Sequence, residues 1–225
     1  METAKKALIG VIADTETDIR MVHAFLEDKG YRVIPKPVRQ TAAECIRFFR
    51  EPQGMRDDYI TLLIKQIMEE GGEAVFVYGN SVCGYVQFDY LAGELNIPIV
   101  TPFHAYEKLG EAYAHPFVWA ATTGALSGIE RSLRKTDFDK DVRGAVHLDI
   151  AKQIEAGKPA DQIIKDNAIA DLIRYNEKSG SDSIFLGCTY YPYLKAEVEK
   201  IATVPVIDPA ETMCGLLEKT LQAKA

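Results

Sequence analysis

The chain has 225 residues, 47% hydrophobic and 26% charged, which is enough to bury an apolar core without disulfides or a structural metal. Its 26 Lys and Arg against 33 Asp and Glu give a net charge of −7, and it has no run of basic residues that could neutralise phosphates. No apolar run approaches the ~20 residues of a membrane-spanning helix. The composition therefore predicts a protein that binds neither nucleic acid nor membrane.

The cysteines and the N-terminal segment predict a cytoplasmic location. The four cysteines are scattered, at Cys45, Cys83, Cys188 and Cys214. They form no C-x-x-C pair, so we exclude a zinc ribbon and a thioredoxin-like motif and expect reduced thiols. The apolar start at Lys5–Ala13 superficially resembles a signal peptide, but it stops at Asp14 without a small-residue cleavage pattern and predicts a first strand instead.

Short apolar runs alternate with helix-period segments in the first half of the chain. The runs predict strands at Ala7–Ala13, Tyr31–Pro35, Ala74–Tyr78 and Pro98–Val100. Apolar residues at helical spacing predict helices at Thr17–Lys29 and Asp57–Glu70, which end at Gly30 and at Gly71-Gly72. Strands that alternate with helices indicate a parallel α/β sheet.

The second half repeats this alternation. It predicts strands at Phe117–Ala121, Ser183–Leu186 and Val204–Ile207. A single amphipathic helix is expected over Pro159–Lys178, and a last helix after Asp208-Pro209, where a capping residue precedes a proline.

The two halves correspond in register. Gly79 and Cys188, each just after an apolar run, are 109 positions apart, and Pro98 and Pro205 are 107 apart. This period is too long for a solenoid repeat and predicts two pseudo-symmetric, doubly wound parallel-sheet lobes. We assign residues 1–103 with the C-terminal segment 208–225 to lobe one and 104–207 to lobe two. Ligands of such sheets bind outside the carboxyl ends of the strands, so we expect the active site between the lobes.

Four loops at predicted strand ends carry small polar groups. They are Asp14-Thr15, Gly79-Asn80-Ser81, Thr122-Thr123 and Gly187-Cys188-Thr189-Tyr190. Their hydroxyl, amide and backbone N–H groups predict a pocket for a small carboxylate. The alternative for any single Thr, Asn or Ser is an ordinary helix cap. The recurrence of this chemistry in all four loops favours the pocket.

Two of the cysteines are candidates for acid–base chemistry. Cys188 follows a predicted strand and precedes a predicted helix, a position that favours a reactive thiolate. Cys83 lies four residues after Gly79, where a functional thiol and a buried core side chain are equally open interpretations. Cys45 and Cys214 lie in helical stretches and are expected to pack in the core.

Other functional motifs fail on inspection. The series Asp137-x-Asp139-x-Asp141 lacks the turn glycine and closing Glu of a calcium loop, so it predicts a solvated charge run. The chain has no phosphate-binding glycine motif after a strand. Its histidines form no H-x-x-x-H pair, so no metal site is expected.

One segment resembles a known family signature. Leu186–Leu194 (LGCTYYPYL) is similar to the L-G-C-T-H-[FY]-P-x-L motif of the cofactor-independent aspartate/glutamate racemase superfamily. Weaker matches are Ile9-Gly10-Val11 with Asp14-Thr15, Asn80-Ser81, Ala121-Thr122 with Ser127, and Val206–Glu211. The resemblance spans essentially the whole chain and implies that no cofactor is needed.

The resemblance also implies a mechanism. In this superfamily two cysteines, one in each lobe, remove and return a proton on opposite faces of the substrate α-carbon, while Thr, Ser and Asn side chains hold its carboxylate. Two residues depart from the pattern. The lobe-one cysteine is replaced by Gly79, with Cys83 as the nearest thiol, and the His after Cys-Thr is replaced by Tyr190.

Three hypotheses follow for the function. The first is a racemase or epimerase of an amino acid or related small carboxylate, which uses Cys188 with Cys83 or another group. The second is a single-cysteine lyase resembling arylmalonate decarboxylases, which have glycine at the first position, although this chain lacks their second G-C-G-type motif. The third is a non-catalytic carboxylate-binding protein. Dimerisation is common in the family, so a homodimer is one expectation.

Overall fold

The structure is a computed structural model that describes residues 7–223. Residues 1–6 and 224–225, which include the beginning of the Lys5–Ala13 segment and both ends of the predicted lobe one, lie outside the described residues. The chain divides into two compact units. The first runs through Thr101 and is completed by the segment from Met213 onward, and the second is Pro102–Thr212.

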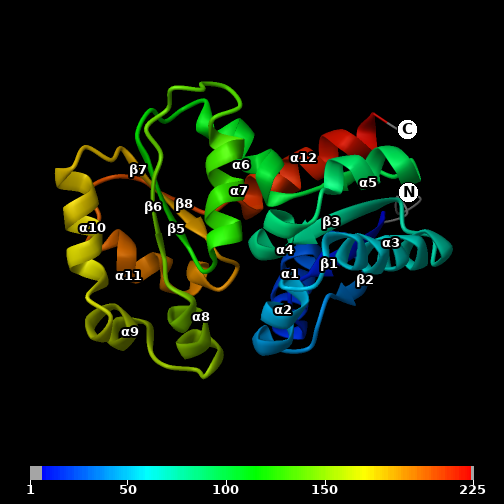
Figure 1. The fold of residues 1–225 in the computed structure, drawn as a ribbon, viewed down its shortest axis with the longest axis horizontal. Coiled ribbons are helices and arrows are strands. Elements are labelled where there is room, and N and C mark those ends of the chain that lie inside the picture. The colour runs from blue at the N-terminus through cyan, green and yellow to red at the C-terminus, as the bar shows by residue number, and fades with distance from the viewer. Residues whose placement is uncertain (1–6, 224–225) are drawn as a thin grey trace, which may run out of the picture. The chain divides into compact units, whose positions relative to one another are not determined.

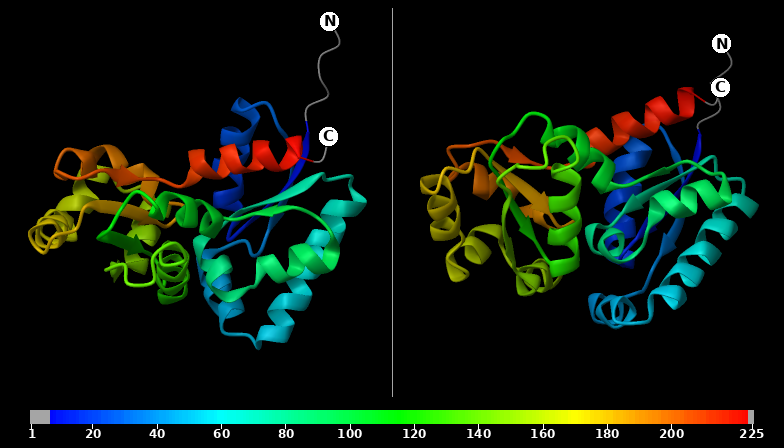
Figure 2. Two further views of the ribbon diagram at one scale, coloured as in Figure 1. Left: turned by 90° about the horizontal axis from the view of Figure 1, so that it is seen from above. Right: turned by 45° about the horizontal axis from the view of Figure 1, so that its top comes forward.

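Each unit is built on its own four-stranded parallel sheet with flanking helices (Figure 1). Figure 2 shows the strands of the first unit, coloured blue to green, and those of the second, coloured green to orange, from two further directions. The predicted parallel α/β architecture is therefore confirmed.

The first unit has strands in the order β2-β1-β3-β4. Its elements are β1 (Leu8–Ala13), α1 (Glu16–Asp28), β2 (Arg32–Pro37), α2 (Ala42–Phe49), α3 (Gln53–Glu69), β3 (Ala74–Tyr78), α4 (Asn80–Tyr85), α5 (Phe88–Leu95) and β4 (Ile99–Val100), and most of α12 (Ala210–Gln222) joins them. Thr15 opens α1 with a capping box closed by Asp18, and Gly30, at φ 90°, makes the turn into β2.

The second unit has strands in the same relative order, β6-β5-β7-β8. Its elements are α6 (Pro102–Gly110), β5 (Pro116–Ala120), α7 (Thr123–Leu133), β6 (Arg143–Val146), α8 (Leu148–Glu155), α9 (Ala160–Asp166), α10 (Ile169–Lys178), β7 (Ser183–Gly187), the 3₁₀ helix η1 (Tyr191–Leu194), α11 (Lys195–Glu199) and β8 (Val206–Ile207). The two units thus share one topology.

This topology creates a switch point in each sheet. β1 lies between β2 and β3, so the β1–β2 and β2–β3 connections run in opposite directions across the sheet and, as right-handed crossovers, cover opposite faces. The same holds for β5 between β6 and β7. A crevice forms outside the carboxyl ends of the strands where the connections part, and ligands of open α/β sheets bind there. The loops that follow β1 and β3, and those that follow β5 and β7, are therefore the places to look for a site.

Both faces of the second sheet are covered, which explains its nearly continuous apolar strands. Phe117 and Trp119 of β5 point into a cluster with Ile163, Ile173 and other residues of the helices on one face. Val118 and Ala120 point the other way, into a cluster with residues of α6 and α7. In Figure 1, α7 runs along the β5–β7 strands, in agreement with this packing.

Two expectations about the second half are wrong. The single helix predicted over Pro159–Lys178 is two helices, α9 and α10, because Ala168 adopts a left-handed conformation with φ 52° between them. The strand β6 was not predicted at all, because Arg143–Val146 is short and only half-buried and shows no apolar alternation.

The helices of residues 7–223 include none that is long and apolar enough to cross a membrane.

Candidate functional site

In the first unit, the register of the sheet brings Asp14 and Gly79 together at the switch point. Ala13, the last residue of β1, pairs with Tyr78, the last residue of β3, so the two following residues lie side by side. The Asp14 carboxylate then reaches across to the start of α4. Its Oδ1 accepts a hydrogen bond from the Val82 N–H at 3.2 Å, and Ser81 adds bonds from its backbone and its hydroxyl.

The Asp14 backbone also makes hydrogen bonds. Its carbonyl oxygen accepts hydrogen bonds from the Cys45 thiol at 2.7 Å and from the Arg39 N–H at 3.1 Å. These contacts come from α2 and from the loop after β2. They fix the strand-end loop from the side opposite to α4.

The Asp14 carboxyl group has an unusual affinity for protons. Burial is the main cause, and the negative charge of nearby Asp18 adds to it, so that the pKa of Asp14 rises from 3.8 to about 8. The hydrogen bonds from Val82 and Ser81 favour the charged form and offset part of this rise. Near neutral pH, this carboxyl group can therefore both give and accept a proton.

Gly79 leaves room that the Asp14 carboxyl group fills. A Cβ atom at position 79 would lie 2.5 Å from Asp14 Oδ1 and 2.9 Å from Val82 Cγ1. The backbone of Gly79 has φ −169°, which any residue adopts, so the exclusion of a side chain is steric and not conformational. In this sheet, the space beside the end of β3 holds the carboxyl group of Asp14, the residue that follows β1.

The other predicted polar residues of the first unit are largely engaged. Thr15 donates its hydroxyl hydrogen to Asp18 Oδ2 at 2.7 Å and caps α1. An ordinary helix cap was the alternative that the sequence left open for this residue. Asn80 and Ser81 are buried, with 4% and 8% of their surface exposed. Asn80 Oδ1 has no hydrogen-bond partner among the described residues, so this buried acceptor is available to a ligand.

Cys83 lies close to the same group but in a poor environment for a thiolate. It sits inside the short helix α4 and is only 6% exposed. Burial, followed by the charges of Asp14 and Asp89, raises the pKa of this thiol well above its usual value. Burial and the same Asp14 charge also raise the pKa of Cys45. Both side chains have the character of core thiols.

In the second unit, Cys188 occupies the place that corresponds to Gly79. Ala120, the last residue of β5, pairs with Gly187, the last residue of β7, and Cys188 follows directly. The residue after Ala120 is Ala121, which is apolar and buried. Cys188 precedes a turn and the 3₁₀ helix η1 instead of an α-helix, so a full helix dipole does not act on its sulfur.

The loop that carries Cys188 rests on an aromatic platform. The Tyr191 N–H donates to the Cys188 carbonyl oxygen at 3.1 Å, and the Tyr191 ring lies 4.5 Å from the Trp119 ring, centroid to centroid. The Tyr191 hydroxyl donates toward the carbonyl oxygens of His147, at 2.7 Å, and Ala120, at 3.2 Å. Burial, with a smaller contribution from Cys188, raises the pKa of Tyr191, so its hydroxyl stays a donor.

The remaining predicted residues of the second unit surround the same strand ends. Thr122 caps α7 through a hydrogen bond from the Ala125 N–H at 3.2 Å, while Thr123 is exposed in the first turn of that helix. Thr189 is half-buried and Tyr190 is 6% exposed. The structure thus brings each predicted residue to the carboxyl edge of the sheet in its own unit.

His147 is a strand-end residue that the sequence did not reveal. It directly follows β6, and its Nδ1 accepts a hydrogen bond from Trp119 Nε1 at 3.1 Å. While this bond is made, the imidazole hydrogen resides on Nε2, which makes that atom a donor. The sequence would have revealed His147 as a strand-end residue only if the strand β6 before it had been recognised.

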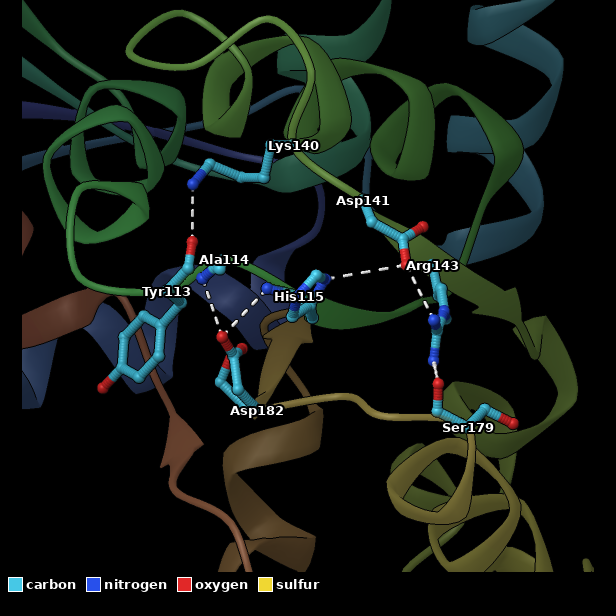
Figure 3. A network of polar contacts seen from close by, with 9 residues as sticks. Tyr113, Ala114, His115, Lys140, Asp141, Arg143, Ser179 and Asp182 are labelled. Carbon is cyan, nitrogen blue, oxygen red and sulfur yellow. Dashed lines mark hydrogen bonds and ion pairs between the residues drawn. The ribbon is translucent and has the colours of Figure 1, made fainter.

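A second polar network lies at the amino ends of the strands, where a functional site is not expected (Figure 3). Asp182 Oδ2, just before β7, accepts hydrogen bonds from the N–H groups of Ala114 at 2.7 Å and His115 at 2.9 Å. Asp141 Oδ2 lies 2.7 Å from Arg143 Nη2, and Arg143 also donates to the Ser179 carbonyl oxygen. Asp137, Asp139 and Asp141 are all exposed, as expected for a solvated charge run, and Asp141 also pairs with Arg143.

The described part of the chain contains no group of three or more His, Cys, Asp or Glu side chains arranged to hold a metal ion.

Known proteins of similar sequence are glutamate racemases. The glutamate racemase of Fusobacterium nucleatum is 25% identical over 140 residues, which are 60% of this chain and 50% of that protein. That of Pseudomonas aeruginosa is 25% identical over 167 residues, 71% of this chain and 62% of that protein. The chain thus spans about half to two thirds of the length of these relatives.

Solved structures share the fold. The glutamate racemase of Francisella tularensis in complex with D-glutamate superposes with a TM-score of 0.77 at 18% identity, over 97% of this chain and 82% of that one. An aspartate racemase homologue from Pyrococcus horikoshii gives a TM-score of 0.64 at 20% identity, over 97% of this chain and 100% of that one.

A family model provides the strongest assignment. The model described as Asp/Glu/Hydantoin racemase matches residues 53–217, which include β3 and β4 of the first sheet, the whole second sheet, Gly79 and Cys188. The chain therefore belongs to the Asp/Glu/Hydantoin racemase family.

Proposed function

We propose that the protein is a cofactor-independent racemase or epimerase that inverts the α-carbon of an amino acid or a related small carboxylate. The observation that carries this proposal is Cys188, a thiol at the carboxyl end of β7 at the switch point of its sheet, in a chain that belongs to a racemase family. The relatives named glutamate racemase, and a similar structure that holds D-glutamate, favour an acidic amino acid as substrate.

The proposed chemistry follows from what inversion requires. A proton must leave one face of the α-carbon and another must arrive on the opposite face, so two acid–base groups are needed. In this proposal Cys188 is one of the two groups. Cys83 is a candidate for the other, although its raised pKa disfavours the thiolate that this role needs. Hydrogen-bond donors on the substrate carboxylate would stabilise the negative charge that develops as the proton leaves.

Substrate binding is assigned to the polar groups at the strand ends. The proposed binding residues are Asp14, Thr15, Gly79, Asn80, Ser81, Thr122, Thr123, Thr189 and Tyr190. Asn80 Oδ1 is the most distinctive of these groups because it is a buried acceptor without a protein partner among the described residues. It suits an α-ammonium group, which has three hydrogens to donate.

A second candidate is a single-cysteine decarboxylase. It is favoured by Gly79, which leaves the first unit without a thiol at the end of β3. A malonate that loses CO2 needs only one proton donor afterwards, and Cys188 would suffice.

The decisive experiment compares these reactions directly. The protein is incubated in D2O with each enantiomer of glutamate and aspartate, and products are followed by chiral chromatography and by proton NMR of the α-position. We expect inversion accompanied by α-deuteration for at least one pair. No inversion of any of the four, together with CO2 release from phenylmalonate, would replace the racemase proposal by the decarboxylase. Binding without either reaction, measured by calorimetry, would favour a carboxylate-binding protein.

Variants test the role of Cys188. Cys188→Ser is expected to lower kcat about 10²–10⁴-fold, the usual contribution of one acid–base group. Cys214→Ala, which also removes a buried thiol, serves as the matched control and should keep the wild-type rate. Full turnover in Cys188→Ser would refute the assignment of this thiol.

A further inference from the structure

The two units of the chain differ at corresponding strand-end positions, and this difference bears on which residue is the second acid–base group. Both sheets have the same strand order, and in each the residue after the third strand of the unit lies beside the residue after the first. In the second unit these residues are Cys188 and Ala121. In the first unit they are Gly79 and Asp14. At these two positions the second unit has a thiol and a methyl group, whereas the first unit has a glycine hydrogen and a carboxyl group.

We propose that the Asp14 carboxyl group is the acid–base group of the first unit and acts in place of a thiol at position 79. This inference rests on the proposed racemase function and names the second group that transfers a proton. It makes catalysis depend on an unlike pair, a carboxyl group and a thiol.

The position of the carboxyl group supports this role. Asp14 Oδ1 lies 2.5 Å from the point where the Cβ atom of a residue at position 79 would be, and Asp14 Cγ lies 3.1 Å from it. The carboxyl group therefore takes up part of the space that a cysteine side chain at position 79 would need. Hydrogen bonds from Val82 and Ser81 keep it in that place. The Asp14 residue as a whole is half-buried at the carboxyl edge of its sheet.

The groups that face Asp14 explain how it can exchange protons. Asp18 of α1 brings a like charge, while Cys83 of α4 and Cys45 of α2 bring thiols whose own pKa values are raised. Arg39, from the loop after β2, brings a positive charge that acts on Cys45, and this charge is shared with Glu51 at 3.6 Å and with two aromatic rings. In these surroundings the pKa of Asp14, about 8, suits a general acid–base group near neutral pH.

The proton balance of the reaction closes with this pair. In one direction the Asp14 carboxylate takes the α-proton, and the electron pair of the broken C–H bond moves toward the substrate carboxylate. The Cys188 S–H bond then breaks as its proton forms the new C–H bond on the other face. Asp14 ends protonated and Cys188 ends as a thiolate, which is the starting state for the opposite enantiomer. Exchange with water restores the first state.

The test is the exchange of α-hydrogen for deuterium without inversion. Wild type and the variants Asp14→Asn and Cys188→Ser are incubated in D2O with each enantiomer of glutamate and aspartate. Both variants should lose racemisation about 10²–10⁴-fold. Each should still exchange the α-hydrogen of one enantiomer, because the remaining group works on one face. We expect the two variants to retain opposite enantiomers. Asp28→Asn, an exposed carboxyl group of α1, is the matched control and should behave as wild type.

Three outcomes would overturn the assignment. One is racemisation by Asp14→Asn within tenfold of wild type. Another is loss of exchange with both enantiomers in Asp14→Asn while its thermal unfolding is unchanged, since this would mark a positioning role. The third is that Cys83→Ala, and not Asp14→Asn, shows the pattern opposite to Cys188→Ser. A wild-type protein that inverts none of the four amino acids would instead overturn the proposed function itself.

Discussion

Gly79 is important for the side chain that it lacks. Gly79→Ala would place a Cβ atom 2.5 Å from Asp14 Oδ1 and 2.9 Å from Val82 Cγ1, so the carboxyl group or the start of α4 must move. We expect the free energy of unfolding to fall by about 1–3 kcal/mol, as at other overpacked sites. We also expect kcat/KM to fall at least tenfold, because a small displacement of a reacting group strongly slows the reaction. Urea denaturation and steady-state kinetics measure these changes.

The control for Gly79→Ala is Gly93→Ala. Gly93 lies in α5, and a Cβ atom there would meet nothing within 4 Å. Since alanine favours a helix more than glycine does, this variant should gain about 0.5–1 kcal/mol of stability and keep its activity. A Gly79→Ala variant that is as stable and active as Gly93→Ala would contradict the packing described for Asp14.

Asp14 should also make stability depend on pH. Its folded-state pKa, about 8, lies above the usual value of 3.8 that it has in the unfolded chain, so between these values the folded state binds more protons than the unfolded state. The free energy of unfolding of wild type should therefore fall as pH rises from about 4 to about 8. Each pKa unit is equivalent to about 1.4 kcal/mol, and because Asp14 is only half-buried we expect a total of about 2–3 kcal/mol.

Asp14→Asn isolates this contribution. The variant should match wild type near pH 4 and be the more stable protein above pH 8, as measured by urea denaturation across the pH range. A difference that is constant with pH would show that folding does not raise the pKa of Asp14.

For individual residues, the sequence identified the positions of the candidates but not their contacts. Asp14 and Gly79 could both be recognised as strand-end residues, because each follows an apolar run. That the Asp14 carboxyl group fills the space beside Gly79 depends on the register between β1 and β3, which are distant in sequence. No local pattern reports such a register. His147 was missed for a related reason, since its strand was not recognised.

Among the elements, the break between α9 and α10 depends on one strained residue. Ala168 has φ 52°, a conformation that costs a non-glycine residue about 1–2 kcal/mol. Ala168→Gly should therefore raise the free energy of unfolding by about 0.5–1 kcal/mol. Ala170→Gly, two residues later inside α10, should lower it by a similar amount. Equal effects of the two variants in thermal denaturation would show that α9 and α10 form one continuous helix.

The periodicity of the sequence could not detect this break. Ile163, Ile164, Ile169 and Ile173 fit one helix, and the structure buries all four against the same cluster. A single left-handed residue redirects the chain without disturbing the apolar pattern. Asn167, which donates to the Ile163 carbonyl oxygen at 2.8 Å and pairs with Gln153, supports the turn through contacts that sequence spacing does not reveal.

The start of β7 depends on Asp182. Although partial burial opposes its ionisation, hydrogen bonds from His115, Ser183 and Ala114 outweigh this effect and hold the pKa of Asp182 below its usual value. Asp182→Ala should lower the free energy of unfolding by about 1–2 kcal/mol at pH 7. Because a lowered pKa stabilises the fold only above the unfolded-state value, the difference should shrink as pH falls below about 4. Acid and urea titrations of both proteins test this, and a difference that persists at pH 2 would contradict it.

At the scale of the whole molecule, the duplication visible in the sequence corresponds to two parallel sheets of one topology. This much was predictable, because buried parallel strands and their crossover helices leave strong local patterns. The duplication also made the difference between the units visible, since Gly79 aligns with Cys188. What the sequence could not supply is the compensating carboxyl group, because it comes from a neighbouring strand and not from the aligned position.

Asp14 and Cys188 as the two acid–base groups are tested most sharply by the enantiomer dependence of α-deuterium exchange in Asp14→Asn and Cys188→Ser, with glutamate and aspartate in D2O. We expect that each variant exchanges one enantiomer and that the two variants exchange opposite ones. Exchange of the same enantiomer by both variants, or of both enantiomers by Asp14→Asn, would contradict this expectation.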